Sequence, residues 1–134
     1  MGTTKKQTLQ YFFEMIARLV QSHLDIWREN DSTKRLKLAG EVYAENIRVT
    51  DPEIILNGRR AVSDFIGQLL NQHPGFKFRI AKPVEVHHET AVLSWEFGPD
   101  TNPGAITGTD IFTISGDKIS ALLTIADGLT PQLN

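Results

Sequence analysis

The chain contains no cysteine among its 134 residues, which excludes disulfides, thiol nucleophiles, iron–sulfur clusters and thiolate zinc sites. It also lacks an excess of either charge: 14 Lys and Arg against 16 Asp and Glu give −2, too little positive charge for a nucleic-acid surface. No uncharged apolar run is long enough to span a membrane. Residues 1–8 are polar and contain no apolar secretory segment, so we expect a cytoplasmic protein.

Several motifs that bind cofactors or metals are missing as well. The sequence has no glycine-rich dinucleotide motif, no P-loop, no GxSxG nucleophile elbow and no HExxH pair. The consecutive His87 and His88 would point to opposite faces of a strand, and no third ligand stands at a suitable spacing. We therefore expect no metal and no cofactor.

The first half of the chain has the periodicity of amphipathic helices. Apolar residues recur every three or four positions over residues 8–30, again after an N-cap at Asp31 as far as Tyr43, and a third time over residues 61–70. A short extended segment, residues 46–50, ends at Asp51. Because Pro52 follows, Asp51 should adopt an extended or turn conformation.

The second half alternates between apolar and polar residues, as strands do. Four strands are predicted within residues 76–86, 91–97, 106–114 and 118–126, with turns at 88–90 and 115–117. Pro83 should mark a bulge or a sheet edge. Helices followed by an antiparallel meander predict an α+β fold in one domain covering residues 1–134.

Three polar residues stand out from their surroundings. His23 lies on the apolar stripe of the first predicted helix, and Asp110 shares the more apolar face of its strand with Phe112. A carboxylate on such a face costs several kcal/mol unless it is paired or hydrogen-bonded. Each also has a structural interpretation: His23 as a core histidine, Asp110 as a bonded or solvent-facing aspartate, and Asp51 as a turn initiator.

The order of these segments resembles the nuclear transport factor 2-like superfamily, and most closely its SnoaL-like branch, which includes polyketide cyclases. The resemblance extends from about residue 9 to residue 127 and is carried by residues 42–52 (VYAENIRVTDP), 58–65 (GRRAVSDF), 91–98, 108–112 and 116–119. It implies a cone in which a curved antiparallel sheet is wrapped by three helices around one interior pocket. It also implies a homodimer through the exposed sheet face, with the surface supplied by Thr107, Thr109, Ile111, Thr113 and alternate residues of 118–126.

Ketosteroid isomerase, a member of this superfamily, combines an aspartate base with a tyrosine and a protonated aspartic acid. The resemblance implies that Asp51 stands at the position of the aspartate base and Asp110 at the position of the protonated aspartic acid. His23 stands where ketosteroid isomerase has the tyrosine. It implies a cofactor-independent isomerase, cyclase or dehydratase acting on an apolar carbonyl compound. Two alternatives remain: a non-catalytic domain that binds an apolar ligand, and a protein-interaction module. For binding an apolar ligand, the residues that matter most would be Trp27, Trp95 and Phe112.

Overall fold

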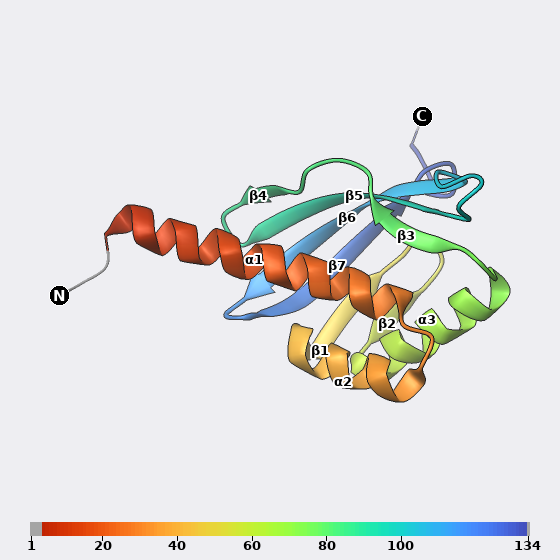
Figure 1. Cartoon of the computed structure of the whole chain (residues 1–134), viewed down its shortest axis with the longest axis horizontal. Coiled ribbons are helices and arrows are strands. Elements are labelled where there is room, and N and C mark those ends of the chain that lie inside the picture. The colour runs from red at the N-terminus through yellow and green to blue at the C-terminus, as the bar shows by residue number, and fades with distance from the viewer. Residues whose placement is uncertain (1–3, 134) are drawn as a thin grey trace.

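Three helices pack against a curved, open sheet in residues 4–133, the part of the chain that the computed structural model describes (Figure 1). Its elements, in order, are α1 (Lys5–Arg28), α2 (Ser32–Val42), β1 (Tyr43–Thr50), β2 (Ile55–Asn57), α3 (Arg59–Gln72), β3 (Lys77–Ile80), β4 (Glu85–His87), β5 (Thr90–Gly98), β6 (Ile106–Ser115) and β7 (Lys118–Ala126). The predicted α+β fold is confirmed. No helix in this part of the chain is long and apolar enough to cross a membrane.

The strands form a sheet in the order β2-β1-β7-β6-β5-β3, with β4 paired to β5. The predicted antiparallel meander is present as β5, β6 and β7. The sheet is not antiparallel throughout, however, because β1 pairs with β7 in parallel. A parallel pair needs a long connection, and α3 with five strands lies between these two. The register shifts between Thr113 and Ile114, an irregularity of the kind that bends a strand.

Local signals at the helix starts explain where the helices begin. Thr4 and Gln7 form a reciprocal capping box, so α1 starts three residues earlier than its apolar pattern indicates. Asp31 caps α2 as predicted, and the backbone N–H of Lys34 holds the pKa of its carboxyl below the usual value. Tyr43 lies just beyond this helix, as the first residue of β1, although the apolar spacing extends to it.

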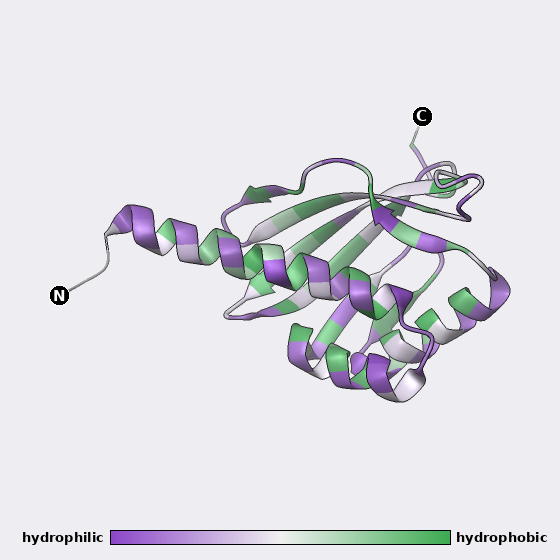
Figure 2. Ribbon diagram, in the orientation of Figure 1, coloured by the Kyte–Doolittle hydropathy of each residue, from purple (hydrophilic) through white to green (hydrophobic). Residues whose placement is uncertain are grey.

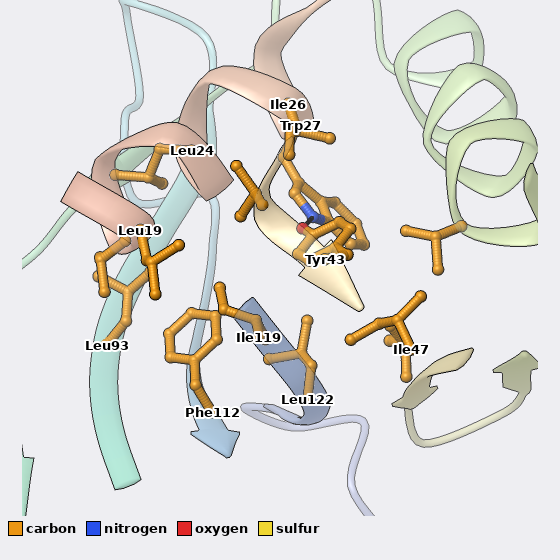
Figure 3. Close-up of a cluster of buried hydrophobic side chains, with 14 of the residues drawn as sticks. Leu19, Leu24, Ile26, Trp27, Tyr43, Ile47, Leu93, Phe112, Ile119 and Leu122 are labelled. Carbon is orange, nitrogen blue, oxygen red and sulfur yellow. Dashed lines mark hydrogen bonds between the residues drawn. The ribbon is translucent and has the colours of Figure 1, made fainter. Parts of the chain in front are cut away.

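The core lies between the inner face of the sheet and the apolar faces of the helices (Figures 2 and 3). Gly108, Asp110, Phe112 and Ile114 of β6 are all buried, which confirms the inward face predicted for Asp110. His23 is buried on α1 at 2 % exposure. Alternation and helical spacing therefore predicted the orientation of both polar residues correctly.

One close approach in the sheet positions a site residue. Trp95 of β5 lies opposite Gly108 of β6. A Cβ at position 108 would come within 2.7 Å of Cε2 of Trp95 and nearer still to the carbonyl oxygen of Ile125. Glycine here lets the indole of Trp95 pack directly against β6, where its Nε1 reaches Asp110.

Candidate functional site

A cavity of about 310 Å³ opens between α1, α3 and the inner face of the sheet. Apolar side chains make most of its wall, and the aromatic ones are Trp27, Phe65, Phe78, Trp95 and Phe97. His23, Asp51 and Asp110 line the same cavity, so the three polar residues predicted from the sequence are brought together.

Phe112 differs from the other predicted ligand contacts. Trp27 and Trp95 line the cavity, but Phe112 does not appear among the lining residues. It is fully buried and packs edge-on against the ring of His23, with ring centroids 4.8 Å apart. Phe112 therefore packs against the ring of His23 and is not one of the residues that line the cavity.

Asp110 is the most tightly held polar group of the cavity. Its Oδ1 accepts hydrogen bonds from Trp95 Nε1 at 3.0 Å and from Thr124 Oγ1 at 2.9 Å. Its Oδ2 lies 3.3 Å from Nε2 of His23. The side chain is 9 % exposed. These contacts make the Asp110 carboxyl group an acceptor, as an ionised carboxylate is.

The contact with Tyr43 indicates which ring nitrogen of His23 carries the hydrogen. The Tyr43 hydroxyl accepts a hydrogen bond from Trp27 Nε1 at 2.9 Å and lies 2.6 Å from His23 Nδ1 (Figure 3 shows Tyr43 against Trp27). Trp27 can only donate, so the Tyr43 hydroxyl hydrogen is left for His23 Nδ1, the one acceptor found for it within residues 4–133. We therefore assign to His23 the tautomer that carries its hydrogen on Nε2 and donates it to Asp110.

Asp51 is held differently, by the main chain. Its Oδ1 accepts from the backbone N–H of Glu53 at 2.8 Å and of Ile54 at 3.2 Å, and its own N–H donates to the Ile54 carbonyl. Both the turn and the cavity contact predicted for Asp51 are thus present. Pro52 and Glu53 line the cavity next to Asp51, and the carboxylates of Asp51 and Glu53 form an acidic edge of the cavity.

Comparisons with known proteins identify the family of the chain. The family model of the SnoaL-like domain matches residues 20–122. The chain belongs to the SnoaL-like family. The match contains His23, Asp51 and Asp110, and it confirms the resemblance stated from the sequence. No protein with a curated description matches the chain.

Several solved structures are similar in fold to this SnoaL-like chain. A SnoaL-like protein from Agrobacterium tumefaciens, classed as an isomerase, is 25% identical with a TM-score of 0.79, over 86% of this chain and 99% of that one. A Sinorhizobium meliloti protein classed as a polyketide cyclase is 18% identical with a TM-score of 0.65, over 81% and 94%. A Kribbella flavida protein classed as a ketosteroid isomerase is 13% identical with a TM-score of 0.64, over 90% and 84%. The last two support the fold alone.

The site of this SnoaL-like domain contains residues that the sequence did not single out. Tyr43 was assigned to a helix, and Thr124 had no distinguishing signal on its strand. The pairing of Asp110 with Thr124 across β6 and β7 follows from a strand register that the sequence does not state. Gln68 and Gln72 of α3 also line the cavity and add amide groups to it.

No three His, Asp or Glu side chains in residues 4–133 are arranged to hold a metal ion. His87 is the last residue of β4, and His88 lies in the turn that follows it, as predicted, with φ of 55°. Their ring centroids are 5.1 Å apart. The two rings are exposed and lie away from the residues that line the cavity.

The SnoaL-like domain should lose stability in alkali through Tyr43. Burial raises the pKa of its phenol above the usual 10.0, and the charge of Asp110 adds to the rise, against the Trp27 hydrogen bond. Above pH 10 the unfolded chain loses this proton while the folded chain keeps it. Unfolding free energy should therefore be unaffected by Tyr43 below pH 10 and fall by about 1.4 kcal/mol per pH unit above it.

Urea unfolding on both sides of pH 10, in the native chain and in Tyr43→Phe, measures this contribution. The other titrating groups are the same in the two chains, so their contribution to the pH dependence of the unfolding free energy cancels in the difference between the chains. Equal slopes above pH 10 in both chains would contradict the prediction.

Proposed function

We propose that the cavity binds a small apolar molecule and catalyses proton transfer on it, as an isomerase or cyclase does. The observation that carries the proposal is the meeting of two carboxylates, Asp51 and Asp110, at one apolar cavity beside His23. The family membership and the 25% identical SnoaL-like protein classed as an isomerase support this class of reaction. A positioned acid or base is what such chemistry requires.

The hydrogen bonds suggest which role each group takes. Asp110 accepts from its neighbours, so we assign it to removing a proton from carbon and returning it to another atom of the substrate. His23 donates Nε2–H to Asp110 and orients it, while Tyr43 fixes the histidine tautomer. This assignment replaces the protonated-acid role that the resemblance implied for Asp110. Asp51 is the second candidate base, since its carboxylate also borders the cavity.

An apolar carbonyl compound fits the remaining groups. Removal of a proton beside a carbonyl places charge on the carbonyl oxygen, which needs a donor. The side-chain amides of Gln68 and Gln72 line the cavity and can donate such a hydrogen bond. The aromatic walls supply the apolar contact for the rest of the molecule.

Exchange of carbon-bound hydrogen for solvent deuterium tests the proposal without knowledge of the product. A panel of apolar cyclic ketones is incubated with the protein in deuterium oxide, and exchange is followed by proton NMR. We expect exchange above the buffer rate for some members, slowed in Asp51→Asn or Asp110→Asn. Binding of panel members with no exchange above the buffer rate would overturn catalysis.

A non-catalytic binding domain is the second candidate. Five aromatic rings line the cavity, and all described buried polar side-chain atoms are already hydrogen-bonded. A site of this kind binds an apolar ligand without any proton transfer. It predicts that Trp27→Ala weakens binding while Asp51→Asn leaves it unchanged.

We also propose a homodimer through the outer face of the sheet. Ile111 and Leu123 are cross-strand neighbours on this face, and Leu123 is 43% exposed. Sedimentation equilibrium at micromolar concentration should give about twice the chain mass of 15.0 kDa. Leu123→Lys should yield monomer, whereas Leu9→Lys, at an exposed position of α1, should not. A native mass of 15.0 kDa would overturn the dimer.

A further inference from the structure

The charges that line the cavity are all of one sign. Asp51, Glu53 and Asp110 border it, and none of the described lining residues is lysine or arginine. Two arginines near the cavity bind main-chain oxygens instead: Arg28 donates to the Phe78 carbonyl and Arg59 to the Tyr43 carbonyl. The cavity therefore has no fixed cation of its own.

Two histidines, His23 and His73, also line the cavity. In the tautomer assigned above, His23 accepts the Tyr43 hydrogen at Nδ1 and donates Nε2–H to Asp110. His73 packs against the rings of Phe76 and Phe97 at the end of α3. With this tautomer, all hydrogen-bond partners of Asp110 in the described part of the chain are uncharged, although its side chain is nine-tenths buried. A buried carboxylate without a counter-ion is strongly attractive to a cation that can reach it.

The walls add a second attraction for positive charge. Phe78 stacks on Phe97 with ring centroids 4.1 Å apart and meets Trp27 and Trp95 edge-on at 5.6 and 5.5 Å. The faces of aromatic rings attract cations, and tryptophan does so most strongly. An aromatic wall beside a buried carboxylate is the arrangement that favours an alkylated ammonium group.

We infer that the cavity selects molecules with an apolar body and a cationic head, a protonated amine or a quaternary ammonium, and rejects anions of the same size. The head lies toward Asp110, and the body lies along the aromatic wall. For a ligand bound in this way, the base of the proposed reaction is Asp51, the second candidate, because Asp110 holds the head. Asp51 and Glu53 at the acidic edge attract the same charge during entry. This inference names the ligand class for the cavity of the proposed function and rests on that cavity being the ligand site.

Three probes of one shape test the inference: phenethyltrimethylammonium, its uncharged tert-butyl isostere, and phenylpropionate. Binding is measured by calorimetry and by the fluorescence of the two tryptophans, Trp27 and Trp95, which both line the cavity. We expect the cation to bind about tenfold or more tightly than the isostere, and the anion more weakly than either. Equal binding of cation and isostere, or tighter binding of the anion, would overturn the inference.

Charge-removing variants assign the selectivity to the cavity. Asp110→Asn should abolish most of the preference for the cation, and Glu53→Gln, at an exposed edge residue, should reduce it without risk to the fold. Asp117→Asn, in the exposed turn between β6 and β7, is the matched control and should leave it unchanged. A preference that survives both cavity variants would contradict the inference.

The two proposals fail separately. Cation preference without deuterium exchange on any probe or ketone would remove the catalytic proposal and keep the ligand class. Exchange on uncharged ketones without a preference for the cation would keep the catalytic proposal and remove the ligand class.

Discussion

Replacing Asp110 by asparagine should lower the rate of the proposed proton transfer by a factor of about 10²–10⁴, the usual cost of removing an essential acid or base. Asparagine keeps an oxygen that accepts from Trp95 and Thr124, while its NH₂ group faces Nε2 of His23 and favours the other tautomer of the histidine. It replaces the second carboxylate oxygen by an N–H₂ group, which cannot take a proton from carbon. The change thus removes the base and keeps most of the shape.

The measurement is the initial rate of deuterium exchange on the best ketone of the panel. Asp117→Asn, which also removes one negative charge but lies in the exposed β6–β7 turn, should keep the native rate. Circular dichroism and thermal unfolding show whether Asp110→Asn is folded. A folded Asp110→Asn variant with the native rate would move the base to Asp51, and native rates in both Asp110→Asn and Asp51→Asn would exclude catalysis by these carboxylates.

Replacing Tyr43 by phenylalanine should lower the unfolding free energy by about 2–4 kcal/mol, because it leaves two buried polar groups without a partner. The Trp27 Nε1–H loses its acceptor, and His23 Nδ1 loses its donor. Tyr43 is 0% exposed, so water does not replace the hydroxyl readily. Urea unfolding at neutral pH measures the loss.

Tyr11→Phe provides a matched control, since Tyr11 is the other tyrosine of the chain and is 65% exposed on α1. It should change stability little. Nitrogen chemical shifts of the His23 ring give a second readout, because they distinguish the tautomer with hydrogen on Nε2. They should indicate that tautomer in the native chain and in Tyr11→Phe but change in Tyr43→Phe. An unchanged ring in Tyr43→Phe would show that Tyr43 does not set the tautomer.

The amino-acid sequence by itself determined the fold class and the direction of the key polar side chains. Helical spacing turned His23 inward, and strand alternation turned Asp110 to the same side, because side-chain direction follows from local backbone geometry. Pro52 determined the turn at Asp51 for a similarly local reason, since proline restricts the residue before it. These features depend on neighbours along the chain.

Only the tertiary structure decided how those groups are joined. Tyr43 continues the apolar spacing of α2 yet begins β1, and its contact with His23 depends on how α1 lies over the sheet. Thr124 reaches Asp110 through the register of β6 and β7. Phe112 lies on the same face of β6 as Asp110 but packs against His23 instead of lining the cavity. Alternation predicts the face of the strand on which a side chain lies, but it does not predict which part of that face a helix covers.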